Sequence, residues 1–529
     1  MKRLFTHFIP IVALVAILVG CTKDGSNGDY KCAVSDKAVA VVRCNINQLL
    51  DKSGEKSHLL KMLRAKLESE DMPDFILEMA KDLRCTGIDI EAPLFIYAEE
   101  IDKDNMFLGV VAKTYNESLL DNLIKHIGRG HVIRTEESDY TLVERGGSNY
   151  VALAYNDVAT VLGFVVPQKW SYSNGDCDAK LYVIEALENA YNGNGGGALL
   201  PAHEEADIAV CGNVETLLAL CKKYNVDIDA SIVGRLKMFE GVRGATVDVV
   251  LNTMPGSIDC RVELRGTTLS EGGALRACSS ENLKYVSADA LAVVNLPFDG
   301  GTVINLINEL RSKSPEFAHI LDREISKATG NTLDSSWALK MAASPLKSLG
   351  GELTLAIDDI DGREIEASAV VGVDNDSIMR LVRLANMINV VDMERVGGDN
   401  YLARVGGVNY YFGQKAGLFY ISTKGEIEPA KESANRASWY SAADGSYGYV
   451  VANLSSILAI QEIRAQVEAE VAKECGSLSE SVMTWLKSLD AILFTAPTPE
   501  SVSLQLLFKN KDENPLVPIA DAVKQIKNL

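Results

Sequence analysis

The chain has 529 residues, of which 47% are hydrophobic, and it carries a formal net charge of −20. This length is more than one small core requires and predicts two to four domains. The hydrophobic content excludes a disordered chain, because it suffices for a core of ordinary size. Proteins bind nucleic acid largely through cationic side chains that contact phosphates, so this acidic chain is not expected to bind it.

The first 21 residues have the layout of a bacterial lipoprotein signal. Lys2 and Arg3 precede a short apolar stretch, residues 8–20, that ends in Leu-Val-Gly-Cys, the pattern of a lipobox. A membrane-spanning helix needs about 20 apolar residues, so a shorter stretch favours a signal peptide. We therefore predict a lipoprotein signal peptide at 1–20 and a diacylglycerol, with acyl chains such as palmitate, on Cys21. The alternatives are an ordinary secretory signal or a buried cysteine.

Residues 21–30 are polar and rich in glycine, which predicts a flexible tether after the anchor. Two or more acyl chains hold a protein durably on a bilayer, so the membrane is an expected partner through lipidated Cys21. Thr22 follows the lipidated cysteine, in place of the Asp that resembles an inner-membrane retention signal. The expected location is the cell envelope, at the outer membrane, with its periplasmic or surface face left open.

The ten cysteines are too few for a disulfide scaffold in a chain of this length. Nine remain when Cys21 is set aside, which is an odd number. One or two disulfides are compatible with this compartment, and the spacing assigns no pairing.

An internal repeat is the clearest structural signal. Four places share an apolar, β-rich run, an asparagine and the start of an amphipathic helix; the asparagines are Asn45, Asn213, Asn295 and Asn453. The first and third are about 250 residues apart, and the second and fourth about 240. This spacing predicts two related halves, with Asn45 superposed on Asn295 and Asn213 on Asn453.

The elements expected between these points recur in the same order in each half. In the first half, strands are expected at 38–44, 94–98, 107–112, 140–143, 150–154, 159–164, 208–212, 245–251 and 258–264, and helices after Asn45, at 59–83, after Asn116 and at 215–224. In the second half, strands are expected at 291–294, 353–357, 365–373, 401–405, 410–412, 418–422, 449–452, 491–495 and 502–508, and helices around 304–307 and at 317–328, 378–388, 454–473 and 517–526.

This order predicts an α+β fold of two tandem, internally duplicated halves with antiparallel sheets and helices packed on one face. The halves are expected at 31–266 and 284–529, joined by a linker at 267–283. The Gly-rich segment 192–197 is a further expected boundary. We interpret it as a solvated linker, with a loop over a groove as the alternative.

Several of these motifs resemble one known family. They are the lipobox, the run from Ala38 to Leu50, Gly87-Ile88-Asp89 before the 93–97 strand, and the 107–112 strand that leads to a helix. Together they resemble an uncharacterised lipoprotein family of the Bacteroidota, catalogued as domain of unknown function 4836. The resemblance implies a cell-envelope protein and supplies no catalytic residues.

No catalytic, cofactor-binding or metal-binding residue is predicted. The chain has no His-Glu-x-x-His helix, no Gly-x-Ser-x-Gly turn and no phosphate-binding loop. The Ser-x-x-Lys matches at 53–56 and 344–347 lack their companion motifs, so we interpret them as surface turns. Asp358, Asp359 and Asp361 before Gly362 indicate an Asp-Gly hairpin turn, with a weak calcium site as the alternative.

The anchor, the repeat and the missing catalytic set favour a non-enzymatic lipoprotein that binds or scaffolds an envelope protein or polymer. One alternative is a surface or periplasmic hydrolase acting on glycan or peptide, because dispersed Asp, Glu and Ser are invisible as a site in one sequence. Another is a lipid or hydrophobe carrier, which would need an apolar cavity open to water.

Overall fold

Contacts within the chain divide this computed structural model into two units. Unit 1 comprises residues 1–269 and 511–529, and unit 2 comprises residues 270–510. The structure describes residues 28–54, 86–102, 105–127, 132–145, 149–167, 178–195, 199–216, 219, 244–267, 276–328, 335–361, 364–387, 393–476 and 479–519. Cys21 with its signal peptide, the helix expected at 59–83 and most of those at 215–224 and 517–526 lie outside these residues. Within them, no helix is long and apolar enough to cross a membrane.

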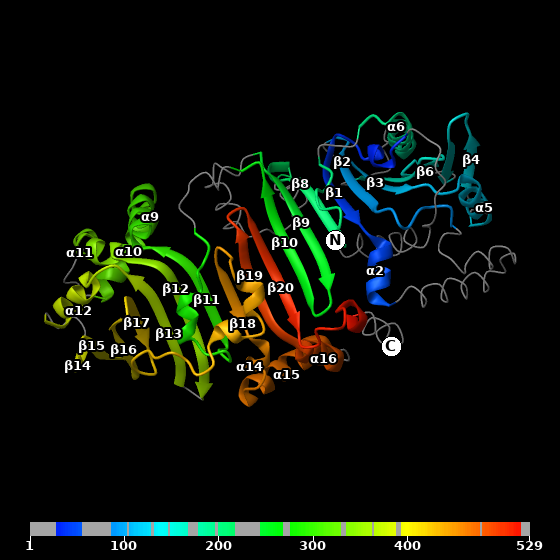
Figure 1. Ribbon diagram of the computed structural model, residues 1–529. Coiled ribbons are helices and arrows are strands. Elements are labelled where there is room, and N and C mark those ends of the chain that lie inside the picture. The colour runs from blue at the N-terminus through cyan, green and yellow to red at the C-terminus, as the bar shows by residue number, and fades with distance from the viewer. Residues whose placement is uncertain are drawn as a thin grey trace. The chain divides into compact units, whose positions relative to one another are not determined.

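The described residues of unit 1 form ten strands that pair antiparallel, several of which are labelled in Figure 1. In space their order is β10-β9-β8-β1-β2-β3-β7-β6-β5-β4. Their bounds are β1 Ala38–Cys44, β2 Leu94–Glu100, β3 Asn105–Lys113, β4 Val132–Glu136, β5 Thr141–Arg145, β6 Val151–Tyr155, β7 Ala159–Pro167, β8 Ile208–Asn213, β9 Thr246–Met254 and β10 Ser257–Arg265.

Short helical segments pack against this sheet, namely η1 Tyr30–Ala33, α2 Ile46–Ser53, α5 Glu117–Ile127 and α6 Ala179–Asn192. The helix expected after Asn116 is confirmed as α5, and the Asn116 Oδ1 accepts a hydrogen bond from the Leu119 N–H at 3.1 Å. Helix α6 was not predicted. It ends at Gly193, whose φ of 63° places it in the left-handed region that favours glycine at this position.

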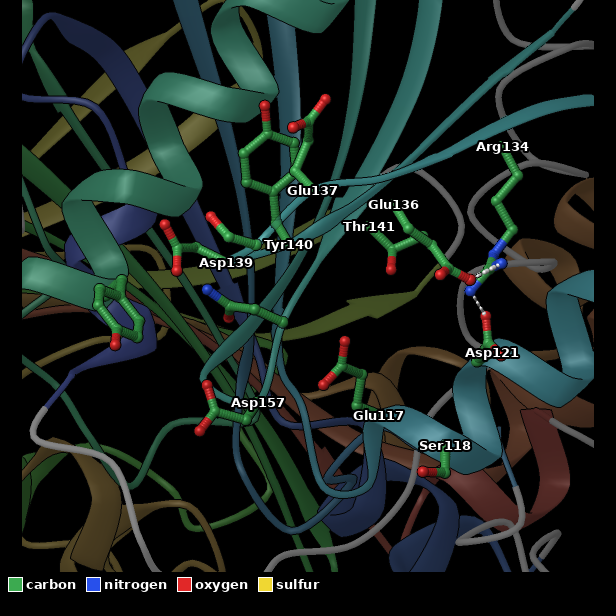
Figure 2. A pocket seen from close by; sticks show the side chains of 13 residues that line it. Glu117, Ser118, Asp121, Arg134, Glu136, Glu137, Asp139, Tyr140, Thr141 and Asp157 are labelled. Atoms are coloured by element: carbon green, nitrogen blue, oxygen red, sulfur yellow. Dashed lines mark hydrogen bonds and ion pairs between the residues drawn. The ribbon is translucent and has the colours of Figure 1, made fainter.

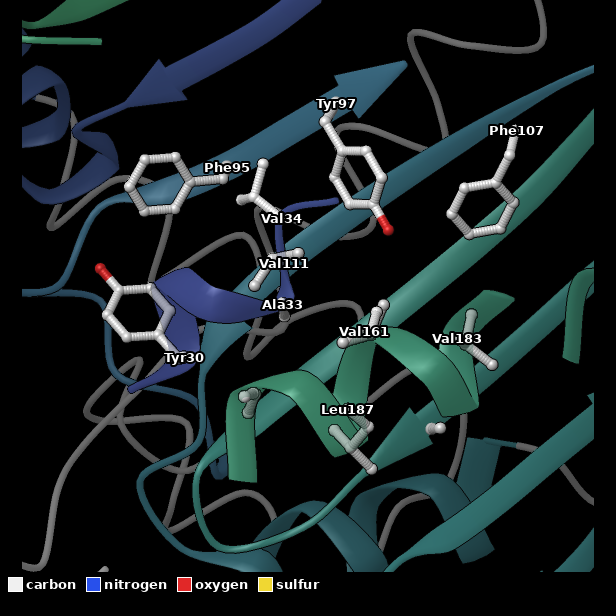
Figure 3. Close-up of a cluster of buried hydrophobic side chains, with 14 of the residues drawn as sticks. Tyr30, Ala33, Val34, Phe95, Tyr97, Phe107, Val111, Val161, Val183 and Leu187 are labelled. Carbon is white, nitrogen blue, oxygen red and sulfur yellow. The ribbon is translucent and has the colours of Figure 1, made fainter. Parts of the chain in front are cut away.

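The main core of unit 1 lies between the sheet, η1 and α6 (Figure 3). Phe107 stacks on Tyr182 with ring centroids 4.9 Å apart, and Tyr97 lies 5.8 Å from Phe107. Gly109 and Gly163 face each other on β3 and β7. These glycines leave the space that the aromatic rings occupy, because a Cβ on Gly109 would lie 2.3 Å from the Tyr97 ring.

Replacing Gly163 with Ala is expected to destabilise the protein by about 1–3 kcal/mol, the usual cost of overpacking a core. An added Cβ would lie 2.5 Å from Val183 Cγ1 and 2.6 Å from Phe107 Cε2. Urea denaturation followed by circular dichroism measures the change. Gly350→Ala is the control, because its Cβ would approach no atom closer than 4.0 Å. An equal effect of the two substitutions would contradict this account of the core.

Ten antiparallel strands also form in the part of unit 2 that the structure describes. Their order is β20-β19-β18-β11-β12-β13-β17-β16-β15-β14. Their bounds are β11 Ala292–Asp299, β12 Leu349–Asp361, β13 Glu364–Val373, β14 Met393–Gly397, β15 Asn400–Val405, β16 Val408–Lys415, β17 Leu418–Ser422, β18 Tyr449–Ala452, β19 Leu489–Thr498 and β20 Ser501–Phe508.

The helices of unit 2 fall into separate groups in Figure 1, with α9, α10, α11 and α12 gathered at one end of β12 and β13. Their bounds are η5 Glu281–Tyr285, α9 Gly300–Lys313, α10 Pro315–Ala328, α11 Ser335–Lys347, α12 Ser377–Met387, η6 Ala434–Arg436, α13 Tyr440–Ala443, α14 Leu454–Ile457, α15 Gln461–Cys475 and α16 Ser479–Ser488. The unit's largest core lies under η5, η6 and α13, where Trp439 and Tyr449 are buried.

The mixed α/β composition and the antiparallel pairing confirm the coarse expectation from sequence. The position expected for Asn295 is wrong. Asn45 precedes α2, whereas Asn295 lies inside β11, paired with Thr354 and Tyr449. Strand β11 continues to Asp299 because its last residues still pair with β12, and α9 begins only at Gly300. The asparagine criterion for superposed halves therefore fails for this pair.

The second pair of asparagines does occupy similar positions. Asn213 Oδ1 accepts a hydrogen bond from the Thr216 N–H at 3.1 Å, and Asn453 Oδ1 accepts one from the Ser456 N–H at 3.2 Å. Each side chain thus caps the turn that follows its strand. The helix expected at 454–473 is interrupted at residues 458–460, and it forms α14 and α15.

The interpretation of the Ser-x-x-Lys match at 344–347 as a turn is wrong. Ser53 ends α2, where its hydroxyl donates to the Leu50 carbonyl at 3.0 Å. Ser344 and Lys347 lie in α11, which continues through Pro345 and packs against α9 and α12. Residues 344–347 are helical because α11 packs on its neighbours. After Ser53, Gly54 has a φ of 68° and forms a turn, and residues 55 and 56 lie outside the described residues.

Candidate functional site

A polar pocket of about 400 Å³ lies in unit 1 between the start of α5, the β4–β5 hairpin and the turn at 156–157 (Figure 2). It is strongly acidic, and Arg134 is its one cationic lining residue. The lining residues are Glu117, Ser118, Asp121, Arg134, Glu136, Glu137, Ser138, Asp139, Tyr140, Thr141, Asn156, Asp157 and Tyr191.

A network of ion pairs and hydrogen bonds fixes one side of this pocket. The Arg134 guanidinium contacts the carboxylates of Asp121 and Glu136, and Lys125 approaches Asp121 at 2.6 Å. Tyr155 Oη donates to Asp121 at 2.9 Å. Burial raises the pKa of Asp121, but the hydrogen bonds from Lys125 and Tyr155 and the charge of Arg134 outweigh it, so the net change lowers this pKa. The network therefore joins α5 to the sheet.

Glu117 lies at the start of α5, on another side of the pocket. Partial burial raises the pKa of Glu117 first, and the charges of Asp157 and Asp121 add to the rise. Among the described residues, no group of three or more His, Cys, Asp or Glu side chains could hold a metal ion. The pocket thus offers acidic charge, with its arginine already paired.

The second candidate is an apolar row on one face of the unit 2 sheet. Seven side chains lie opposite one another on seven neighbouring strands: Leu504, Phe494, Val450, Val294, Leu355, Ala369 and Ile421. Directly opposite residues on antiparallel strands have Cβ atoms about 5 Å apart, so the row is continuous. Five of the seven side chains are between 40% and 48% exposed: Leu504, Phe494, Val450, Leu355 and Ile421. Contiguous apolar surface of this kind marks binding sites in soluble proteins.

A hollow of about 380 Å³ lies on this row, over β11, β12, β13 and β17. Alanines at 292, 367 and 369 leave space, and Leu355 and Ile421 are among the larger side chains beside it. No charged side chain lines it. The lining residues are Ala292, Val294, Leu355, Ala356, Ile357, Ala367, Ser368, Ala369, Tyr410, Ile421, Ser422 and Thr423.

The row is exposed because the helices of unit 2 pack mainly on one another. Helix α9 packs on α10 and α11, and α15 packs on α16. The residues that alternate with the row on β11, β18 and β19 are Val293, Val451 and Leu493, which are buried in the core under η5, η6 and α13. On these three strands both faces carry apolar side chains, and among the described residues the face with Val293, Val451 and Leu493 is the covered one.

The site residue predicted from sequence, Cys21, lies outside the described residues. Sequence reasoning missed the apolar row, although a signal for it exists in β11, β18 and β19. Antiparallel strands with one solvated face usually alternate apolar and polar residues. These strands instead read Ala-Val-Val, Tyr-Val-Val-Ala and Ala-Ile-Leu-Phe, with apolar side chains on both faces.

Of the six cysteines that the structure describes, none is in a disulfide: Cys32, Cys44, Cys211, Cys260, Cys278 and Cys475. Cys85, Cys177 and Cys221 lie outside the described residues. Burial, with a smaller contribution from the neighbouring Asp248 and Glu352 respectively, raises the pKa of Cys211 and of Cys278 to about 12. These two thiols therefore stay protonated and pack as small apolar groups.

Three comparisons with known proteins give no match: no family model, no curated protein and no solved structure is similar to this chain.

Proposed function

We propose that the protein is a lipid-anchored, non-enzymatic binding protein of the cell envelope that holds a neutral apolar ligand on the open sheet face of unit 2. The observation that carries this proposal is the apolar row with its hollow. Of the non-enzymatic roles expected from the sequence, the hollow favours the hydrophobe carrier over a scaffold for another protein or a polymer.

The size and chemistry of the hollow support this class of ligand. Its volume of about 380 Å³ falls within the roughly 300–1,000 Å³ of typical ligand sites. The hollow has no charged lining residue, and therefore no cation to pair with a fatty carboxylate. An uncharged aliphatic or aromatic molecule loses no strong hydrogen bonds on entering such a site. The expected affinity comes from burial of apolar surface.

The two units of the chain have the same strand order. We infer that units 1 and 2 are related repeats. The two strand orders correspond element by element, from β1 with β11 to β10 with β20. The strand register aligns Asn295 with Arg43, not with Asn45, because Ala40–Gly212 and Ala292–Ala452 are corresponding pairs.

Hydrogen bonds before the first strand repeat at the same spacing. The Ala38 N–H donates to the Ser35 carbonyl at 3.0 Å, and the Ala290 N–H donates to the Ser287 carbonyl at 3.2 Å. The Ser35 and Ser287 hydroxyls likewise accept from Lys37 N–H and Asp289 N–H. A shared strand order alone can recur by convergence, but matching local hydrogen bonds are better explained by duplication.

If the units are repeats, the apolar row of unit 2 has a counterpart in unit 1, and the side chains of that counterpart are less exposed. The corresponding row in unit 1 is also apolar throughout: Val262, Val249, Val210, Val42, Ile96, Val110 and Leu162. None of these seven side chains is exposed. Ile46 and Leu50 of α2 and Leu120 of α5 belong to the cluster that covers part of it. The ligand is therefore expected on unit 2.

The predicted lipid anchor would hold unit 2 at a membrane surface. We propose that Cys21 is lipidated and that the tether at 21–30 attaches the protein to the outer membrane. The lipobox supports this, and so does the resemblance to the Bacteroidota lipoprotein family. A binding protein held at a bilayer lies where neutral apolar molecules accumulate.

A titration with N-phenyl-1-naphthylamine, an uncharged probe that fluoresces in apolar sites, tests the proposal. The soluble chain from residue 23 onward is expected to bind it saturably, with a stoichiometry near one. The binding should persist at high salt, because no ion pair contributes to it. A linear, non-saturating signal would count against a site. Competition by a neutral long-chain alcohol but not by a peptidoglycan fragment or an envelope polysaccharide would separate the carrier from the scaffold.

A further inference from the structure

A buried group of polar side chains in unit 2 lies on the face of the sheet opposite the apolar row. We call it the polar nest. Each member is at least nine-tenths buried, and each has one side-chain atom without a hydrogen-bond partner in the described part of the protein. The atoms are Ser280 Oγ, Asn295 Nδ2, Glu352 Oε2, Trp439 Nε1, Tyr449 Oη and Thr495 Oγ1.

The strand register brings three of these residues together. Asn295 on β11 lies opposite Tyr449 on β18, and Tyr449 lies opposite Thr495 on β19. Asn295 also lies opposite Thr354, whose hydroxyl donates to Asn295 Oδ1 at 2.7 Å. The amide oxygen of Asn295 is therefore used within the sheet, which leaves its Nδ2 to donate elsewhere. Trp439 packs beside Tyr449, with ring centroids 6.2 Å apart.

Two local distortions of the backbone place Glu352 and Ser280 beside Asn295 and Tyr449. The pairing of β12 with β13 shifts between Gly350 and Leu353, and such irregularities re-aim side chains. Ser280 has a φ of 58°, which is uncommon for a residue other than glycine. The Ser280 N–H donates to Glu352 Oε1 at 2.8 Å, and Asn282 Nδ2 donates to the Glu352 carbonyl at 3.1 Å. One carboxylate oxygen, Oε2, remains unpartnered.

The pKa of Tyr449 is raised, and its causes show which side chains lie near the Tyr449 hydroxyl. Burial raises it most, and the neighbouring Cys278 and Glu352 raise it further, while Ser280 and Asn295 lie close enough to lower it in part. Neither of those two side chains makes a hydrogen bond of normal geometry with the Tyr449 hydroxyl. The Tyr449 hydroxyl, the Ser280 hydroxyl and the Asn295 amide nitrogen thus lie near one another, and none of the three makes a well-formed hydrogen bond within the described residues.

The donor and acceptor types select the ligand. Asn295 Nδ2 and Trp439 Nε1 can only donate, which disfavours a cation. The Glu352 carboxylate disfavours an anion. A ligand that both donates and accepts fits all six atoms, and the enclosure by buried side chains restricts it to a very small molecule. Water meets each of these conditions.

We propose that the polar nest is a binding site for buried water that links the Glu352 carboxylate to the Tyr449 hydroxyl and the Asn295 amide. The site is specific to unit 2. In unit 1 the residue at the register position of Asn295 is Arg43, whose guanidinium donates directly to the His203 carbonyl at 2.8 Å. This last comparison rests on the proposed duplication, but the water site itself does not.

A crystal structure of the chain from residue 23 onward, at a resolution that shows ordered water, tests the proposal. We expect solvent density within about 2.7–3.2 Å of both Glu352 Oε2 and Tyr449 Oη. The Thr114 and Thr160 hydroxyls, buried and 2.9 Å apart, are the internal control and should have no water between them. Direct hydrogen bonds among the polar nest atoms, with no solvent density, would overturn the proposal.

A second measurement works in solution. The indole N–H of Trp439, assigned by its loss in Trp439→Phe, should show a nuclear Overhauser effect to a long-lived water. Asn295→Leu keeps the side-chain size and removes the donors, so it should abolish this effect, while Thr160→Val should leave it unchanged. Absence of the effect in the unmodified protein would overturn the proposal whether or not the variants fold.

Discussion

Replacing Val450 with Asp is expected to weaken binding of N-phenyl-1-naphthylamine at least tenfold, which corresponds to a loss of about 1.4 kcal/mol. Val450 lies in the middle of the apolar row, between Val294 and Phe494. A carboxylate there would lose its hydration when an apolar ligand covers it, and burying an unpaired charge is costly. Because the Val450 side chain is 42% exposed in the free protein, the fold should tolerate the charge.

Val408→Asp is the matched control for this prediction. Val408 has a similar exposure, 40%, and it lies at the β15–β16 turn, outside the apolar row, whereas Val450 pairs with Val294, which lines the hollow. Its substitution should leave the dissociation constant within about twofold. Circular dichroism should show both variants folded. Equal affinity of Val450→Asp and the unmodified protein would show that the probe does not bind on the apolar row.

Replacing Trp439 with Ala is expected to destabilise unit 2 by about 3–5 kcal/mol, the usual cost of truncating a fully buried Trp. Trp439 is 1% exposed and is the largest of the fully buried side chains in the described residues. It packs on Tyr449 and belongs to the core under η5, η6 and α13. Its loss would open a cavity directly behind β18, which also carries the apolar row.

Denaturation in urea, followed by circular dichroism, measures this effect as a lower midpoint for the transition of unit 2. Met387→Ala is the control, because Met387 at the end of α12 is 76% exposed and should change stability by less than about 0.5 kcal/mol. A Trp439→Ala variant with unchanged stability would show that these segments do not form the core of the unit.

The strands that alternate or carry apolar runs could be predicted from the sequence, and β1, β3 and β18 lie where they were expected. Strands β4 and β14 were missed. Their side chains are largely exposed, and β4 carries Arg134 and Glu136, so neither strand has an apolar pattern to detect. Local composition cannot reveal a short polar strand whose place depends on its neighbour in the sheet.

The apolar row could not be located from the sequence for a different reason. Val450 and Val451 are equally apolar, yet one is exposed and the other is buried. Which face of the sheet is covered depends on where η5, η6 and the helices pack, and that is a property of tertiary structure. The misplacement of Asn295 has a related cause, because pairing with β12, not the asparagine, decides where β11 ends.

The most direct test of the central claim is photo-crosslinking with a long-chain alcohol that carries a diazirine, followed by mass spectrometry of the labelled peptides. The account predicts labels on β11, β12, β13, β17, β18 or β19 of unit 2, and their loss in Val450→Asp but not in Val408→Asp. Labels confined to unit 1, or spread evenly over the chain, would contradict a ligand site on the open sheet face.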